Sequence, residues 1–105
     1  MALIEIGECI YDATLFDKSH GFELLDAVAR EAFVNHLHVT GDNAALEASR
    51  IIESWVTEMR LRWPGRTFRI YRQNEATEVT IRFHVVRTDL PNWCEQGIEI
   101  LTVAA

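Results

Sequence analysis

The chain has 105 residues, which corresponds to a single domain of ordinary size, residues 1–105. Its apolar share of 49% and charged share of 25% are typical of a globular protein that forms its own core without disulfides or metals. The net charge of −6 argues against general nucleic-acid binding and against docking on an anionic membrane, because both require an excess of cations.

The cellular location is also constrained by composition. No apolar segment approaches the ~20 residues that a membrane-spanning helix needs, and the N-terminus lacks the basic start of a signal peptide. The cysteines Cys9 and Cys94 fit unpaired thiols in a reducing compartment. We therefore expect a cytoplasmic protein.

The first half of the chain predicts one strand and one helix. Apolar and polar side chains alternate over residues 2–11, which is typical of a strand. Ser19 is a suitable N-cap for a helix whose apolar residues recur at steps of three and four over residues 22–37. The stretch 39–43 breaks this pattern, and its glycine suits the exit of a helix.

The second half predicts a helix followed by strands. An apolar stripe indicates a helix from about Ala44 to Arg62, which the following Trp-Pro-Gly sequence ends. Residues 67–71 and 79–86 alternate as two strands of a hairpin, and residues 98–103 form a last strand. A short helical turn is predicted within residues 90–96.

These elements predict an α+β fold. The expected architecture is a two-layer sandwich, in which a four-stranded, mostly antiparallel sheet carries both helices on one face. The element order is β-α-α-β-β-(short α)-β. With a helix over residues 90–96, it approaches the β-α-β-β-α-β order of ferredoxin-like folds.

The outer face of this sheet is the predicted binding surface. Alternation places the apolar side chains of the 67–71 and 79–86 strands under the helices, so the opposite face presents Arg69, Tyr71, Arg82 and His84. Arginine and tyrosine are over-represented at binding surfaces. Trp93, in a loop, is the fifth candidate contact, as either an anchor or a plug of the core. Glu5 and Glu99 from the flanking strands are expected beside the arginines, and the simplest alternative is a solvated face with weak cross-strand ion pairs.

Catalytic and metal-binding patterns are weak. The glycines are isolated, so no phosphate-binding loop is present, and no serine lies in a nucleophile-elbow sequence. His36 and His38 point apart on a helix and share a face only on extended backbone. Glu95 beside Cys94 opposes thiolate formation. We predict no catalytic residues, no metal and no cofactor, and we lean towards a protein that is not an enzyme.

Charge is distributed unevenly along the chain. All eight basic residues between Arg50 and Arg87 are arginine, whereas the preceding part of the chain is strongly acidic. Much of this positive charge is expected to be neutralised within the fold. Acidic side chains such as Glu23, Asp26 and Glu31 suit helix starts, or alternatively a surface that faces a basic partner.

Three hypotheses about function follow. The first is a small, non-enzymatic protein-interaction module that binds a protein partner or itself, as a homo-oligomer, through the outer sheet face or an edge. The second is a binder of a small anionic ligand, or an enzyme acting on one, that uses the Arg/Tyr/His sheet face. The third is an acidic inhibitor of a protein that acts on nucleic acid.

Overall fold

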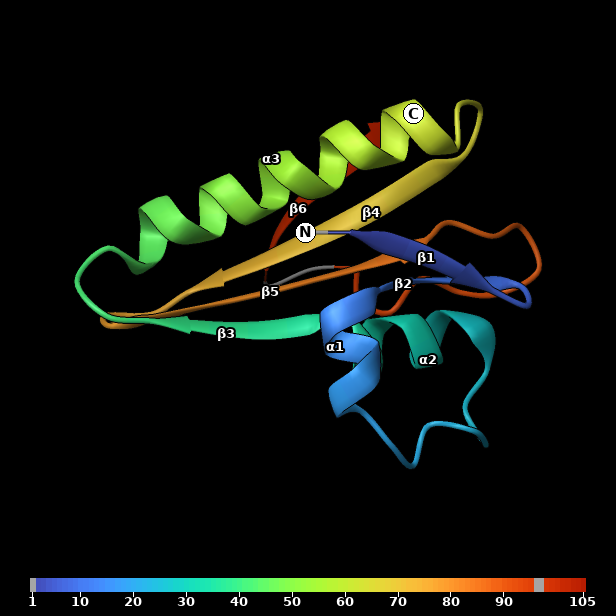
Figure 1. The fold of residues 1–105 in the computed structure, drawn as a ribbon, viewed down its shortest axis with the longest axis horizontal. Helices are drawn as coiled ribbons and strands as arrows, with labels where there is room; N and C mark the ends of the chain where they lie inside the picture. Colours follow the sequence, from blue (N-terminus) through green and yellow to red (C-terminus); the bar gives the residue numbers. More distant parts are fainter. Residues whose placement is uncertain (1, 96–97) are drawn as a thin grey trace.

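The protein has the predicted α+β fold, with a four-stranded antiparallel sheet and helices on one side of it (Figure 1). The computed structural model describes residues 2–95 and 98–105. Within these residues, none of the helices combines the length and the apolar composition that crossing a bilayer requires.

The main sheet has the strand order β3-β5-β4-β6, and all of its pairings are antiparallel. Its strands are β3 (His36–Thr40), β4 (Thr67–Asn74), β5 (Glu78–Val85) and β6 (Glu99–Ala104). Helix α3 (Ala44–Arg62), which has the predicted bounds, connects β3 to β4. Because β5 lies between β3 and β4, these elements form the split β-α-β unit that ferredoxin-like folds share.

The core lies between α3 and the inner face of the sheet. Trp55 and Met59 of α3 are fully buried, and the Trp55 ring meets Phe83 edge-on at 4.8 Å between centroids. Phe68 packs between Phe83 and Trp63, at 6.5 and 6.4 Å. Burial of each side chain of this size contributes about 1.5–3 kcal/mol, so this layer supplies much of the stability. The inward and outward alternation predicted for β4 and β5 is confirmed.

The prediction of one strand over residues 2–11 was wrong. The segment forms a hairpin of β1 (Leu3–Ile6) and β2 (Cys9–Asp12), which is a separate two-stranded sheet. Gly7 turns the chain between them with a φ of 61°, a conformation that glycine adopts without steric cost. Alternation alone did not distinguish one long strand from two short ones.

The prediction of one helix with Ser19 as N-cap was also wrong. The structure has α1 (Ala13–Lys18) and α2 (Ala27–Val34), whose N-caps are Asp12 and Asp26. Ser19 instead ends α1, and its backbone N–H bonds to a carbonyl of that helix. Each aspartate accepts hydrogen bonds from the free N–H groups of a first helical turn, which fixes where each helix begins.

Strand β3 takes the place in the sheet that was assigned to residues 2–11. Leu37 and Val39 pair with Ile81 and Val79 and extend the apolar face of the sheet. The predicted helical turn is absent from residues 90–95, and residue 96 lies outside the described residues. The hairpin, α1 and α2 gather near the start of β3, away from the first turn of α3 (Figure 1).

Candidate functional site

The five predicted binding residues lie together on the outer face of the sheet. Arg69 pairs with His84 across β4 and β5, and Tyr71 pairs with Arg82. Trp93 follows β5 and reaches back over this surface, with its ring 5.1 Å from that of Tyr71. Spacing along two strands was sufficient to bring the first four together, because alternate residues of paired strands share a face.

This face is covered by the chain itself. Residues 92–95, which we call the strap, lie across it without helix or strand structure. Beneath them His84 and Tyr71 are 0% and 1% exposed, so the expectation of a solvated face was wrong at these two positions. A strand pattern reveals which residues share a face, but it does not reveal that a later loop returns to cover them.

His84 and Tyr71 hold the backbone of the strap. His84 Nδ1 lies 3.0 Å from the carbonyl oxygen of Val85, which can only accept, and this assigns the ring proton to Nδ1. Nε2 is then an acceptor, and it lies 2.8 Å from the Tyr71 hydroxyl and 3.4 Å from the backbone nitrogen of Trp93. The Tyr71 oxygen in turn accepts the N–H of Cys94 at 3.3 Å. Two strap amides are therefore satisfied by side chains of the sheet.

Burial sets the protonation of this pair. Desolvation lowers the pKa of His84, and the nearby guanidinium of Arg69 acts in the same direction. Desolvation also raises the pKa of Tyr71. The neutral imidazole and the neutral phenol are thus the favoured forms, which matches the hydrogen-bond pattern.

Two arginines hold the side chains of the strap. The guanidinium of Arg82 lies 4.0 Å from the centroid of the Trp93 ring and donates to the Ala32 carbonyl at the end of α2. Arg69 pairs with the Glu95 carboxylate at 3.1 Å. Its Nε atom is buried and has no hydrogen-bond partner among the described residues. Trp93 itself is 39% exposed, so it is a surface contact and does not plug the core.

The acids expected beside these arginines lie elsewhere. Glu5, in the hairpin, accepts from the Trp63 indole at 3.0 Å and pairs with Arg66. Glu99 lies on the α3 side of the sheet, at the rim of a groove. Glu95 takes their place beside Arg69. The misassignment follows from placing residues 2–11 in the main sheet and from an incorrect face for the last strand.

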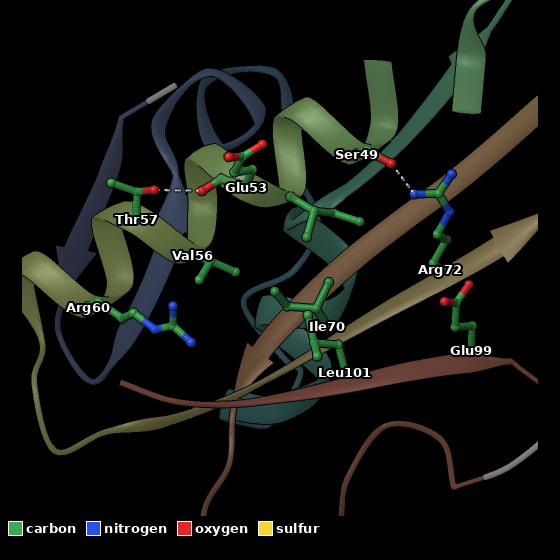
Figure 2. A pocket seen from close by; sticks show the side chains of 10 residues that line it. Ser49, Glu53, Val56, Thr57, Arg60, Ile70, Arg72, Glu99 and Leu101 are labelled. Carbon is green, nitrogen blue, oxygen red and sulfur yellow. Dashed lines mark hydrogen bonds between the residues drawn. The ribbon is translucent and has the colours of Figure 1, made fainter. Parts of the chain in front are cut away.

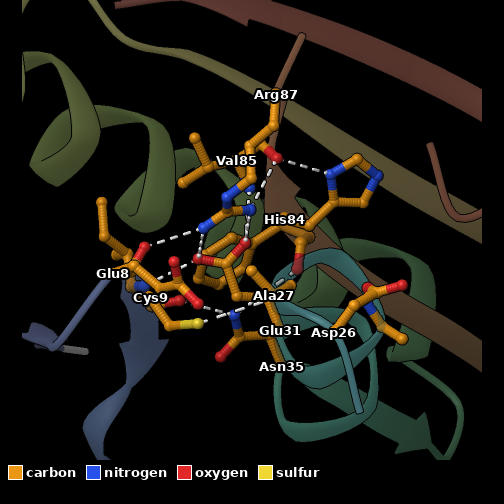
Figure 3. Close-up of polar contacts among 12 residues, drawn as sticks. Glu8, Cys9, Asp26, Ala27, Glu31, Asn35, His84, Val85 and Arg87 are labelled. Carbon is orange, nitrogen blue, oxygen red and sulfur yellow. Dashed lines mark hydrogen bonds and ion pairs between the residues drawn. The ribbon is translucent and has the colours of Figure 1, made fainter. Parts of the chain in front are cut away.

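A buried ion pair joins the hairpin to the sheet (Figure 3). Both oxygens of Glu31, on α2, accept from the Arg87 guanidinium at 2.6 and 3.0 Å. The same carboxylate accepts the N–H groups of Ile10 at 2.7 Å and Val85 at 3.0 Å. Asn35 bridges the same two strands: it accepts from Asp12 N and donates to Ile10 O on β2, and its amide also donates to Phe83 O on β5 at 3.4 Å. Strands β2 and β5 belong to different sheets and are not paired with each other. Side chains of Glu31 and Asn35 supply the hydrogen bonds that connect them.

The sequence did not reveal this role of Glu31. The alternative assignment of Glu31 to a surface that faces a basic partner is wrong, because its side chain is 0% exposed. The Glu31 carboxylate raises the pKa of Arg87 despite the opposing effect of burial. A glutamate in an apolar stretch of α2, with Ala32, Phe33 and Val34 after it, was the available signal.

A groove of about 480 Å³ lies between α3 and the last strand of the sheet (Figure 2). Apolar side chains line its floor, and charged or polar ones surround it. The floor residues are Ile52, Val56, Ile70 and Leu101, and the others are Ser49, Glu53, Thr57, Arg60, Arg72 and Glu99. Leu101 is 49% exposed because α3 packs mainly over β3, β5 and β4, whereas Val103 near the end of β6 is buried in the core.

The remaining candidates carry little chemistry. His36 and His38 lie on β3, which is the extended arrangement, and their rings are 5.3 Å apart. His38 also contacts Glu78 at 3.2 Å. Even so, no cluster of three or more His, Cys, Asp or Glu suited to a metal occurs in residues 2–95 and 98–105. Cys9 and Cys94 form no disulfide with each other.

Comparison with known proteins adds no assignment. No family model, no curated protein and no solved structure matches this chain. The two surfaces described above, the strap-covered face and the open groove beside β6, are the features from which a function can be argued.

Proposed function

We propose that this protein is a self-associating interaction module that dimerises through the free edge of β6. The observation that carries the proposal is the open edge of β6 beside an apolar groove. Among the described strands, β6 pairs with β4 alone, so its other edge presents backbone N–H and C=O groups to solvent.

The composition of β6 favours pairing at this edge. Proteins commonly protect edge strands with lysine, proline or a β-bulge. Strand β6 has the sequence Glu-Ile-Leu-Thr-Val-Ala, and its only charge is the first residue. Antiparallel pairing with a second copy places Glu99 near the far end of the partner strand, so the two carboxylates stay apart. The two sheets would then continue as one.

The groove supports a second copy as the occupant. A two-fold axis through paired β6 strands sets the two α3 helices antiparallel on the same side of the combined sheet. Glu53 and Arg60 line the groove at different positions along α3, so an antiparallel arrangement of the two helices would turn the acidic position of one groove towards the basic position of the other. Leu101, half-exposed in one chain, gains an apolar neighbour across the axis. The outer face is less suited to this contact, because the strap covers its centre.

The proposal is tested by measuring the oligomeric state of the wild-type protein and of a variant that carries a new charge in the groove. We expect the wild-type chain to elute with the mass of two chains in size-exclusion chromatography with light scattering. Leu101→Lys should give one chain, because two lysines would meet near the axis without water. Leu24→Lys is the matched control: Leu24 is fully exposed, between α1 and α2, and should leave the dimer unchanged. A wild-type monomer at high protein concentration would contradict the proposal.

A further inference from the structure

The strap contacts the sheet as a bound peptide contacts its receptor. Trp93 and Glu95 are exposed, while Asn92 and Cys94 are partly buried, so the strap lies on the surface and is no part of the core. Its contacts fall into two kinds. Backbone groups of Trp93 and Cys94 bond to His84 and Tyr71, and the side chains of Trp93 and Glu95 bind the arginines.

The surface under the strap is one that tolerates water. Arg69, Tyr71, Arg82 and His84 are all amphipathic, with polar groups that hydrate well. The apolar core lies on the opposite face of the sheet and shares none of these side chains. Release of the strap therefore uncovers the rings of Tyr71 and His84 but none of the apolar cluster between α3 and the sheet, so we expect a local opening to cost less than global unfolding.

The strap is also anchored at its start. Leu90 packs against the cluster formed by Cys9, Tyr11, Ala27 and Val34, so the chain before the strap stays in place when the strap leaves. A segment tethered in this way competes with an external ligand as an intramolecular one, at an effective concentration in the millimolar range for short tethers.

We propose that the outer sheet face is a docking site for an extended peptide of a partner protein, which the strap occupies as an intramolecular competitor. The ligand class follows from the contacts. An aromatic residue lies against the Arg82 guanidinium and meets the Tyr71 ring edge-on, and a carboxylate two residues later pairs with Arg69. The backbone bonds to His84 and Tyr71 can form with a peptide of any sequence. The specificity is therefore carried by the aromatic side chain and the carboxylate of the peptide. This site is separate from the β6 edge and stands or fails independently of it.

A synthetic peptide tests the proposal. It has the sequence of residues 91–95 with serine for cysteine and a fluorescent label at its N-terminus. The double variant Trp93→Ala/Glu95→Gln weakens the strap and leaves the sheet residues unchanged. By fluorescence anisotropy, the peptide should bind this variant at least about tenfold more tightly than wild type, since a site that is open less than a tenth of the time weakens apparent affinity by that factor.

Two controls define specificity. A peptide with alanine and glutamine at the positions of Trp93 and Glu95 should lose this binding, and so should the intact peptide when Arg69→Ala is added to the double variant. Equal binding of both peptides, or no binding to a double variant that unfolds cooperatively, would overturn the proposal.

Hydrogen exchange of the wild-type protein gives an independent reading. The amides of Trp93 and Cys94, which bond to His84 and Tyr71, should exchange by local opening, faster than the amides of β5 and without dependence on denaturant at low concentration. Exchange of these strap amides only through global unfolding would show that the strap does not leave the site, and would overturn the proposal even if the double variant fails to fold.

Discussion

Glu31 accepts four hydrogen bonds inside the protein and has no exposed surface. Its carboxylate joins α2, the hairpin and the end of β5, and its charge is balanced by Arg87 in a bidentate pair. Such a pair does not by itself prove a gain in stability, because desolvation of both ions is costly. Removal of one partner is nonetheless expensive, because the other charge is left buried.

Substitution of Glu31 should therefore be among the most destabilising changes in the chain. We expect Glu31→Ala to lower the free energy of unfolding by about 3–5 kcal/mol. Glu31→Gln keeps the shape but turns an amide N–H group towards a donor, and should cost at least about 2 kcal/mol. Urea denaturation at pH 7 measures both changes. Glu75→Ala, at an exposed loop position, is the control and should stay within about 0.5 kcal/mol. A similarly small effect of Glu31→Ala would contradict a structural role for the pair.

His84 predicts a pH dependence of stability. Burial lowers its pKa in the folded protein below the ordinary histidine value of about 6.5, so the unfolded chain binds more protons in the interval between the two values. The free energy of unfolding is therefore highest above pH 6.5 and falls as the pH drops towards the folded pKa. Protonation also places an N–H on Nε2, where it opposes the N–H of Trp93.

Chemical denaturation at pH 7.5 and pH 5.5 tests this behaviour. The charged groups that interact with His84 are Arg69, Arg87, Glu31 and Glu95, and burial raises the pKa of Tyr71, so its phenol stays neutral over this range. We expect His84→Gln, whose amide does not titrate, to show a smaller loss of stability between the two pH values than wild type. An equal loss in both proteins would assign the pH dependence to other groups.

At the scale of elements, short helices begin where aspartates provide caps. Asp12 accepts from the N–H groups of Thr14 and Leu15 with one oxygen, and from the Trp55 indole with the other, at 2.9 Å. It thereby fixes the end of β2, the start of α1 and the orientation of the largest core side chain together. Asp26 is exposed, and its side chain caps α2 by accepting one hydrogen bond from Ala29 N.

The two caps give a matched pair of substitutions. Asp26→Ala should cost about 1 kcal/mol, the usual value for a lost helix cap. Asp12→Ala should cost about 2–4 kcal/mol, because the buried Trp55 N–H also loses its acceptor. Thermal and urea denaturation measure the difference, and tryptophan fluorescence reports the changed surroundings of Trp55. Equal costs at the two sites would show that the bond to Trp55 contributes nothing measurable.

Across the whole molecule, the arginine-rich segment links parts of the chain that are distant in sequence. Arg66 pairs with Glu5 and Arg87 with Glu31, so the segment is tied to the acidic N-terminal part. Arg72 reaches α3 through Ser49 and Ala45, and Arg69 binds the strap. The arginines therefore serve different contacts and form no single basic patch, as their placement on separate predicted elements indicated.

Local sequence determined the elements whose signal is complete within one segment. Helix α3 has a long apolar stripe, a glycine before it and a proline after it, and its bounds were predicted correctly. Strands β4 and β5 alternate without interruption, so the residues on each of their faces were also correct. The grouping of Arg69, Tyr71, Arg82 and His84 follows from that alternation and from antiparallel pairing.

Tertiary structure decided the features that depend on contacts between distant segments. The stretch from His36 to Thr40 carries both helical and extended patterns, and pairing with β5 makes it a strand. Glu31 lies in the interior because the edges of β2 and β5 both need a hydrogen-bond acceptor there. The strap covers the outer face because each of its groups finds a partner there. Arg69 pairs with its carboxylate, Arg82 lies against its indole ring, and Tyr71 and His84 accept its backbone N–H groups. Periodicity within a segment records which side of that segment is apolar, but the partner that covers each side is set only when the whole chain has folded.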